Sequence, residues 1–517
     1  MLTILLAAFT VTLASYLFSL LAFTSPAHDQ SWLIYAAQQI LAGAKLYGPR
    51  VVEVNPPLII WFSAIPALLA RLLHIDPLRA LQIVVLAGIF VSTAWCARIL
   101  RLAGLAAQPV LFYASIVSVL AAELFLHGFD FGQREQLLVA LILPWLLWVA
   151  FCSPSSLPTA ERCLLGFAAG VAVCFKPQQV LILFAVALFI VIRDRSLRRI
   201  FTLDFVCAGI AVVTYIATVW IAAPLYLSKT IPLLLDTYWA YGDHTTWALI
   251  KESPVYGFIY VAVLAIFLWR RHSLRYASAT GLFLACSLAA CIAYCMQHVN
   301  APYHIYPQEA FLLLALFWLV MGYLTPAYMA SWRFNSAFVL SVLVFALVFV
   351  PLIIVAGRRL AKTSSALKSY PESVFERYPP QTPVYIFSDN VWDAFPAVLE
   401  DHLVWANRTP FMWMLPAIIQ NEVAEAGGPA PRKVLPTAVV KKLADLQRAD
   451  TTEDFRRWKP AVVIDMECHP AHPCRALDHF DFDPLKWFLK SPAFAAEWSH
   501  YRLQSSHGVF DVYTRVP

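Results

Sequence analysis

Acidic and basic side chains gather in the polar segments between long apolar runs, and their types suit transfer of a group from a phosphate. Asp29 and Glu53 lie in the first such segment, where a carboxylate could act as general base on a hydroxyl. Arg134 and Lys176 lie in later segments, where cations could hold a phosphate. The other candidates for substrate binding are polar or aromatic: Tyr47, Arg50, Asn55, Glu135, Tyr303 and His304.

The composition indicates a membrane protein. The 517 residues are 60% hydrophobic and 14% charged, with a mean hydropathy of +0.66, whereas a soluble domain has about 25% charged residues. A helix needs roughly 20 apolar residues to cross the hydrocarbon layer, and many such runs are present. The net charge of +6 comes without a polybasic tail and gives no reason to propose nucleic acid as a partner.

The apolar runs predict about eleven transmembrane helices. The first lacks a basic start and a nearby cleavage site, so we interpret it as a retained helix and not as a signal peptide. Two runs are short and joined through KPQQ, which predicts a tight hairpin or a pair of partial spans. The predicted spans are 2–24, 78–100, 105–126, 136–152, 163–175, 179–192, 201–226, 253–270, 276–296, 306–324 and 335–357.

Charge asymmetry between the loops predicts the orientation. Alternate loops contain eleven arginines: Arg98, Arg101, Arg162, Arg193, Arg195, Arg198, Arg199, Arg270, Arg271, Arg275 and Arg333. The opposite loops contain mostly single basic residues. Because loops rich in Arg and Lys stay in the cytoplasm, the amino terminus is predicted inside and everything after residue 357 outside.

The segment 56–73, PPLIIWFSAIPALLARLL, is ambiguous. Counting it as a span would place the later arginine clusters outside. It opens with two prolines and ends near Arg71, so we interpret it as an amphipathic helix lying along the outer interface.

In this orientation the candidate residues fall in five outer loops. Ionisable groups at membrane depth are costly and usually mark a functional pathway, so their gathering at one interface predicts a site open to lipid and water. Structural interpretations remain open for each: Asp29 could cap a helix starting near Ser31, and Arg134 and Lys176 could be anchors that reach toward lipid headgroups. His304 could be an ordinary loop histidine, and the loop aromatics an interfacial belt.

The first outer loop carries a resemblance to a known group. The sequence HDQSWLIYAAQQILAGAKLYGPRVVEVNPPL resembles the corresponding loop of the GT-C glycosyltransferases, which include the protein O-mannosyltransferases and the lipid A aminoarabinose transferase. Asp29, the AAQQILAGAKLY run to Tyr47, and Asn55-Pro56-Pro57 match its pattern in order. The resemblance covers residues 1–357 and implies a GT-C-like transmembrane domain, with residues 25–77 as first outer loop, followed by an extracytoplasmic domain at 358–517.

The resemblance also implies a function and a location. A GT-C enzyme of a bacterial inner membrane would transfer a sugar from a polyprenyl-phosphate donor to a glycan, lipid or protein acceptor. Asp29 would then be the base or orient the acceptor, and Glu53, Asp130 and Glu135 compete as a second acid. Residues 1–357 contain no acidic pair of the D-x-D type, so no cofactor is assigned and a divalent metal stays open. Alternatives are a flippase for a lipid-linked saccharide and a glycan polymerase or ligase using a polyprenyl diphosphate.

The carboxyl-terminal 155 or so residues are expected to form a small α/β domain. Residues 382–388, 461–466 and 509–516 read as strands, and TAVVKKLADLQ as a helical or loop stretch. Cys468 and Cys474 predict a disulfide outside the cytoplasm, with a zinc site alongside His469 and His472 as the alternative. The segment 405–416, WANRTPFMWMLP, either packs with its domain against the interfacial helices, which we favour, or folds back over the membrane site and binds carbohydrate.

Overall fold

The chain forms two compact units. The computed structural model describes residues 28–124, 130–153, 156–242, 244–252, 254–328, 369–469 and 481–516, together with Leu13, Tyr16, Leu17, Cys474 and Leu477. Unit 1 comprises Met1–Ser25, Arg79–Thr218 and His244–Ala366, and unit 2 comprises Pro26–Leu78, Val219–Asp243 and Leu367–Pro517. The predicted domain boundary at 357 lies outside the described residues.

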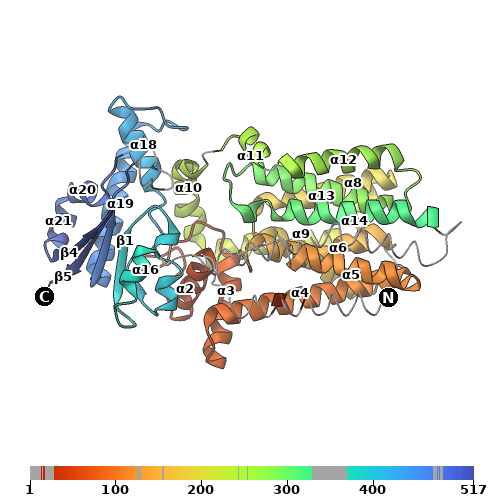
Figure 1. Cartoon of the computed structure of the whole chain (residues 1–517), viewed down its shortest axis with the longest axis horizontal. Coiled ribbons are helices and arrows are strands. Elements are labelled where there is room, and N and C mark those ends of the chain that lie inside the picture. The colour runs from red at the N-terminus through yellow and green to blue at the C-terminus, as the bar shows by residue number, and fades with distance from the viewer. Residues whose placement is uncertain are drawn as a thin grey trace. The chain divides into compact units, whose positions relative to one another are not determined.

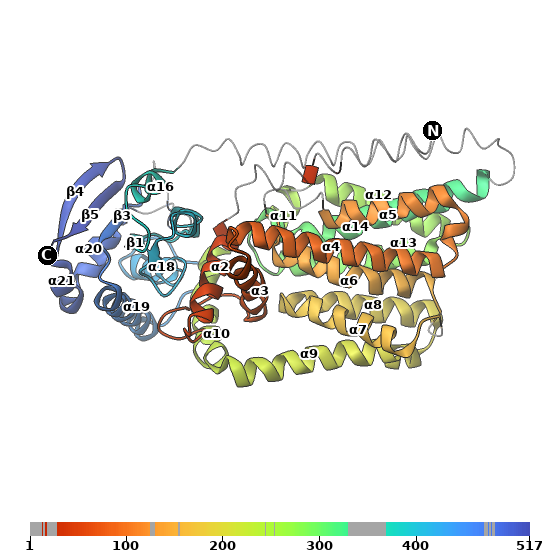
Figure 2. The same cartoon turned by 90° about the horizontal axis from the view of Figure 1, so that it is seen from below.

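Unit 1 is a bundle of apolar helices that run side by side (Figures 1 and 2). Its main helices, two of which extend at one end into unit 2, are α4 (Pro77–Leu102), α5 (Pro109–Leu124), α6 (Arg134–Phe151), α7 (Thr159–Cys174), α8 (Val180–Asp194), α9 (Leu203–Ala222), α12 (Pro254–Arg270), α13 (Ala277–Cys295) and α14 (Tyr306–Tyr328). They coincide with nine of the predicted spans. The first and last predicted spans fall almost wholly outside the described residues.

Length and apolar composition allow six described segments to cross a membrane. They are Pro77–Leu102, Arg134–Phe151, Pro177–Asp194, Leu203–Ala222, Ala277–Cys295 and Tyr306–Tyr323. The predicted KPQQ hairpin is present: α7 ends at Cys174, the short helix η2 (Pro177–Gln179) follows, and α8 begins at Val180.

Small residues let two of these helices approach closely. A Cβ on Gly166 of α7 would lie 2.0 Å from the carbonyl oxygen of Asp204 in α9, and one on Gly170 would lie 2.4 Å from that of Ala208. Such a small-xxx-small pattern is common where helices pack within a membrane. Trp145 of α6 also donates a hydrogen bond to the Asp204 carboxylate at 2.9 Å.

The arginine-rich loops meet at one end of unit 1. Arg98, near the end of α4, pairs with Glu161, at the start of α7, with 2.9 Å between Nε and Oε1. Arg193, near the end of α8, donates to the Val149 carbonyl of α6 at 2.9 Å and to Ser278 of α13 at 3.0 Å. This gathering of arginines is what the charge rule requires. That this end faces the cytoplasm stays a prediction.

Unit 2 contains a five-stranded mixed sheet of order β2-β1-β3-β5-β4. Its strands are β1 (Pro383–Phe387), β2 (Val404–Trp405), β3 (Val462–Met466), β4 (Tyr501–His507) and β5 (Phe510–Arg515); the first three run parallel, and β5 is antiparallel to β3 and β4. The α/β prediction and its three strands are confirmed. The short β2 and the mostly exposed β4 were not expected from the sequence.

The other elements of unit 2 are helices. The carboxyl-terminal part contributes α16 (Tyr370–Phe375), η7 (Val391–Asp393), α17 (Ala397–Glu400), α18 (Leu415–Glu425), α19 (Thr437–Trp458), α20 (Pro484–Leu489) and α21 (Pro492–Trp498). The first outer loop contributes α2 (His28–Leu41) and α3 (Leu58–Leu73), and the segment after α9 contributes η4 (Tyr226–Thr230), α10 (Ile231–Thr237) and η5 (Tyr238–Tyr241).

The first outer loop shares a core with the carboxyl-terminal sheet. The backbone N–H of Trp405, in β2, donates to the hydroxyl of Tyr35, in α2, at 2.9 Å. The ring of Phe395 lies edge-on to Trp32, Tyr35 and Trp405 at centroid distances of 5.5–5.8 Å. Aromatic pairs in this geometry add about 0.5–1.5 kcal/mol each beyond the area that they bury. These contacts explain why the loop belongs to unit 2.

The predicted amphipathic helix is present as α3. Ile59, Ile60 and Ala67 are buried, whereas Ile65 and Leu72 are 55% and 66% exposed. The exposed side chains are apolar, which is typical of a helix that lies in a lipid interface. Its placement at the outer interface stays a prediction.

Two alternatives in the carboxyl-terminal domain are decided. Cys468 and Cys474 form a disulfide with a Cα–Cα distance of 5.2 Å, so the predicted disulfide is confirmed. Trp405, Arg408 and Trp413 are at most 5% exposed. Carbohydrate binding by these three buried side chains is therefore wrong. The Trp405 N–H bonds to Tyr35 of the first outer loop, and packing against interfacial helices stays a prediction.

A buried carboxyl in the sheet makes stability depend on pH. Asp465 of β3 is 2% exposed, and its Oδ1 accepts no hydrogen bond from any described residue. Burial, with smaller contributions from Asp483, Glu467 and Asp511, raises its pKa well above 3.8. The folded state therefore holds this proton more tightly than the unfolded chain, and the stability of unit 2 should fall as pH rises above about 4.

We expect Asp465→Asn to remove this dependence. The amide keeps an oxygen for the Leu485 N–H but carries no charge, so unit 2 should gain about 1–3 kcal/mol at pH 8 and little at pH 4. Thermal unfolding of the full-length protein at both pH values measures the effect. Asp481→Asn, at a mostly exposed carboxylate, is the matched control, and an unchanged pH slope in Asp465→Asn would contradict the prediction.

Candidate functional site

Two cations of unit 1 share one aromatic ring. The Arg134 guanidinium carbon lies 5.9 Å and the Lys176 Nζ 5.8 Å from the centroid of Tyr303. Arg134 begins α6, Lys176 lies between α7 and η2, and Tyr303 is in η6 (Pro302–His304), just before α14. Three of the five predicted outer loops, distant in sequence, therefore converge. Cation–π attraction to the ring offsets part of the repulsion between the two cations.

A buried ion pair completes this group. Lys176 Nζ lies 2.5 Å from Glu135 Oε1, and the two residues are 8% and 1% exposed. The other carboxylate oxygen, Oε2, has no hydrogen-bond partner among the described residues. Glu135 therefore orients Lys176 and presents a second acceptor. His304 is also buried, with its ring edge-on to Tyr303 at 4.5 Å.

The turn that places Arg134 and Glu135 is held by a glutamine. The Gln136 side chain accepts a hydrogen bond from the Gly132 N–H at 2.7 Å and donates one to the Glu123 carbonyl at 2.9 Å. Gly132 has φ +85°, a conformation that glycine adopts at little cost. These contacts fix the backbone just before α6 and hence the positions of both candidate side chains.

Glu123, near the end of α5, was not singled out from the sequence. Its carboxyl group is fully buried and accepts hydrogen bonds from Ser92 at 2.6 Å and Thr93 at 2.9 Å, both in α4. A lone acid in an apolar run was the available signal, because ionisable groups at membrane depth are rare. The contacts assign it a role in joining α4 to α5 beneath the Gln136 turn.

Helix direction adds positive potential at the cation pair. Both α6 and α14 begin at this end of unit 1, and the amino-terminal end of a helix carries about half a positive charge. Two cations and two helix starts form an environment suited to an anion.

In unit 2, Glu53 is the centre of a second polar group. It is 1% exposed and accepts hydrogen bonds from the indole of Trp32 and, at 2.9 and 2.5 Å, from the backbone and side-chain nitrogens of Asn55. The Tyr47 hydroxyl donates to the Asn55 carbonyl at 2.6 Å, and its ring packs on Tyr226 at 4.9 Å. Glu53, Tyr47 and Asn55 are thus brought together. The indole and the two Asn55 nitrogens are all donors, which suits a structural acceptor.

Asp29 lies inside the first turn of α2. The helix already includes His28, so the expectation of a cap for a helix starting near Ser31 is wrong. An acid in the first turn is stabilised by the helix dipole. Its Oδ1 lies 3.3 Å from His28 Nε2, and its side chain is 22% exposed. Asp29 therefore combines access with a neighbouring donor, whereas Glu53 is enclosed.

Arg50 does not join either group. It is exposed on the loop, and its guanidinium forms no ion pair with any residue that the structure describes. The residues of the sequence prediction thus fall into one group in unit 1 (Arg134, Glu135, Lys176, Tyr303 and His304) and one in unit 2 (Tyr47, Glu53 and Asn55), with Asp29 on α2 one helical turn from the Trp32 that contacts Glu53.

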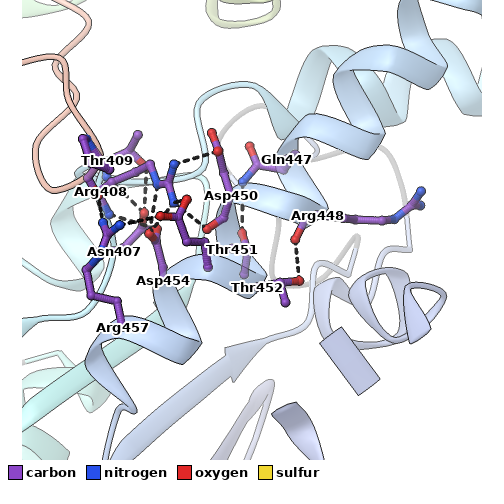
Figure 3. Close-up of polar contacts among 12 residues, drawn as sticks. Asn407, Arg408, Thr409, Gln447, Arg448, Asp450, Thr451, Thr452, Asp454 and Arg457 are labelled. Carbon is purple, nitrogen blue, oxygen red and sulfur yellow. Dashed lines mark hydrogen bonds and ion pairs between the residues drawn. The ribbon is translucent and has the colours of Figure 1, made fainter. Parts of the chain in front are cut away.

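A buried arginine ties the first loop to α19. Arg408 pairs with Asp454 at 2.7 Å and Asp450 at 2.6 Å (Figure 3). It also pairs with Glu453 at 3.0 Å. Its carbonyl accepts the N–H of Val52 at 2.7 Å, next to Glu53.

The protonation of this cluster reflects its burial. Burial raises the pKa of Asp454 to about 7, although the hydrogen bond and charge of Arg408 lower that pKa in part. In the more exposed Glu453, the hydrogen bond from Arg408 has the larger effect and lowers the pKa. Three acidic side chains already compensate the charge of Arg408, so this arginine does not require a bound anion. We assign the cluster to holding the Val52–Glu53 backbone. The sequence did not suggest this role because Arg408 lies 42–46 positions from the three acids and each residue is ordinary alone.

The described residues contain no group of three or more His, Cys, Asp or Glu arranged to hold a metal ion. The side chains that they gather at the two polar groups are cations, carboxylates and aromatic rings.

Comparison with solved structures identifies the fold. The structure is similar over 99% of its length to ArnT from Cupriavidus metallidurans bound to undecaprenyl phosphate, with a TM-score of 0.54, 14% identity and 98% of that chain covered. It is similar to the same protein in the apo state with a TM-score of 0.51, 13% identity and 98% coverage. No protein-family model and no curated protein matches the sequence. ArnT has the GT-C fold, so the predicted fold class is confirmed.

Proposed function

We propose that this protein is a membrane glycosyltransferase that moves a sugar from a polyprenyl-phosphate donor to an acceptor hydroxyl at the outer face of a bacterial inner membrane. The observation that carries the proposal is the pair of cations, Arg134 and Lys176, buried around one tyrosine ring at an end of an apolar bundle. Charged groups placed there suit a phosphate whose lipid chain lies among apolar helices.

Two further findings support this assignment. The fold is shared, at 14% identity, with a protein whose structure holds undecaprenyl phosphate. Within unit 1 the arginine-rich loops and the cation pair occupy opposite ends of the bundle, as the contacts of Arg98 and Arg193 at one end and of Lys176 at the other indicate. If the arginine-rich end is cytoplasmic, the cation pair faces outward.

The proposed reaction is a direct displacement at the anomeric carbon. The acceptor oxygen forms the new bond to that carbon as the bond to the phosphate oxygen breaks, and the carrier leaves as polyprenyl phosphate. Asp29 accepts the proton of the acceptor hydroxyl. Arg134 and Lys176 stabilise the charge that grows on the departing phosphate, and such electrostatic stabilisation usually contributes most to catalysis. Phosphate is a good leaving group, so no strong acid is required.

Glu135 and Tyr303 have supporting roles in this proposal. Glu135 orients Lys176 through the 2.5 Å ion pair, and its second oxygen is available to a hydroxyl of the donor. Tyr303 holds both cations at one ring and so sets their separation. The enclosed Glu53 is proposed to position α2 through Trp32 and not to exchange protons.

A reconstituted assay tests the function. Purified protein in proteoliposomes would be given, in parallel reactions, undecaprenyl-phosphate monosaccharides or undecaprenyl-diphosphate saccharides with a radiolabelled sugar, together with an extract of bacterial envelope glycolipids and glycans. We expect covalent labelling of an acceptor and release of undecaprenyl phosphate. Passage of intact donor across the bilayer without covalent transfer would indicate a flippase, and labelling only from a diphosphate carrier would indicate a polymerase or ligase.

A further inference from the structure

The carboxyl-terminal domain places an exposed tryptophan beside the first turn of α2, within unit 2. The ring of Trp392, in η7, lies 3.9 Å from the ring of His28, with 32° between the planes. His28 Nε2 in turn lies 3.3 Å from Asp29 Oδ1. Trp392 is therefore one side chain removed from the carboxylate to which we assign proton transfer, although 363 positions separate the two in the sequence.

Trp392 differs from other tryptophans of this domain in its exposure. It is 39% exposed, whereas Trp405, Trp413 and Trp487 are 2–3% exposed and serve the core. The His28 ring that it contacts is 6% exposed. Part of a large aromatic surface thus remains in solvent, held against a buried histidine beside an acid.

The turn that carries Trp392 is fixed by several hydrogen bonds. The Asn390 side chain accepts from the Trp392 N–H at 3.3 Å, and the Ser388 hydroxyl accepts from the Asn390 N–H at 2.9 Å while donating to the Asp393 carboxylate. The Tyr241 hydroxyl donates to the Asp389 carbonyl at 2.9 Å. The ring is therefore presented on a pre-ordered turn, and binding to it requires little loss of backbone entropy.

The chemistry around the ring suits a carbohydrate. A flat aromatic face can pack against the apolar C–H face of a sugar ring, and carboxylates accept hydrogen bonds from hydroxyl groups. Asp393 directly follows the tryptophan and is partly exposed, and burial raises its pKa to about 6. At neutral pH the Asp393 carboxyl group is therefore mainly ionised and can act as an acceptor.

We propose that Trp392 forms the acceptor platform of this enzyme, on which a sugar ring of a carbohydrate-containing acceptor stacks with its hydroxyl directed to Asp29. The inference rests on the proposed transferase function and adds the class of acceptor. Trp392 touches the acceptor and sets specificity, whereas His28 is a positioning residue that acts through Asp29. The carboxyl-terminal domain thereby contributes directly to acceptor binding.

Saturation-transfer NMR with maltose and cellobiose as probes tests the platform on full-length protein in nanodiscs. We expect Trp392→Ala to weaken disaccharide binding about tenfold or more and Trp392→Phe to stay within about threefold of wild type. Trp269→Ala, at a tryptophan 72% exposed in α12 of unit 1, should change nothing. Absence of disaccharide binding by the wild-type protein, or unchanged binding by Trp392→Ala, would overturn the proposal.

Two further measurements separate this inference from the proposed function. Undecaprenyl phosphate binding should be the same in wild type, Trp392→Ala and Trp392→Phe; a wild-type protein that fails to bind it counts against the function and not against the platform. His28→Phe keeps an aromatic ring against Trp392 but removes the partner of Asp29. It should lower the turnover rate at saturating acceptor with little change in disaccharide affinity, and the reverse pattern would contradict the positioning role.

Discussion

Replacing Asp29 with Asn should abolish measurable sugar transfer, with a loss of about 10²–10⁴-fold in turnover. The amide is nearly the same size as the carboxylate but cannot accept the proton of the acceptor hydroxyl. The measurement is release of undecaprenyl phosphate, together with labelled product, under saturating donor. Binding of undecaprenyl phosphate itself should be unaffected, because the residues proposed to hold it are in unit 1.

Folding should survive this change. Loss of an acid from the first turn of α2 costs about 0.3–1 kcal/mol through the helix dipole, a small part of the stability of a domain. Asp483→Asn, at the amino-terminal cap of α20, is a matched control that also removes an acid from the start of a helix and should leave transfer intact. Full activity in Asp29→Asn would remove Asp29 from the mechanism.

Replacing Lys176 with Met should weaken the binding of undecaprenyl phosphate by at least about tenfold, because a charged hydrogen bond to phosphate contributes about 1.5–3 kcal/mol. Equilibrium binding of the radiolabelled lipid in nanodiscs measures this loss. The same change leaves the carboxylate of Glu135, which is 1% exposed, without its cation. Breaking a buried pair in this way costs about 3–5 kcal/mol, so Lys176→Met alone mixes two effects.

The double variant Lys176→Met/Glu135→Gln separates them. It removes both charges of the pair, and replacing a buried ion pair by neutral groups of similar volume is often close to neutral for stability. We expect the double variant to unfold near the wild-type temperature while still binding undecaprenyl phosphate weakly. Binding at the wild-type level in a stable double variant would show that Lys176 does not contact the phosphate.

The sequence was sufficient to predict features that depend on residues close together in the chain. Apolar runs of sufficient length have to become helices in lipid because their backbone groups must be bonded internally, and nine predicted spans appear as helices. The order of these helices also predicts that every second loop, where the arginines lie, is at the same end of the bundle. The strands β1 and β3 are apolar runs of parallel, buried type, and the disulfide joins cysteines only six positions apart.

The candidate site was foreseen in part for the same reason. Arg134, Lys176 and Tyr303 each lie in a loop at the same end of alternating helices, so helix order alone brings them to one end of the bundle. Their contact with a single ring, and the pairing of Lys176 with Glu135, depend on how α6, α7 and η6 pack. No periodicity in the sequence encodes that packing.

The sequence by itself determined the membrane character, the order of the helices and the small α/β domain. That Asp29, Arg134 and Lys176 serve a phosphate-linked donor stays a prediction. Only the tertiary structure decided that the first outer loop shares a core with the carboxyl-terminal domain, through Tyr35 and Trp405, that Arg408 holds the backbone beside Glu53, and that Trp392 stacks on His28. Each of these contacts joins residues more than 350 positions apart. They arise because buried polar and aromatic groups must find partners in three dimensions.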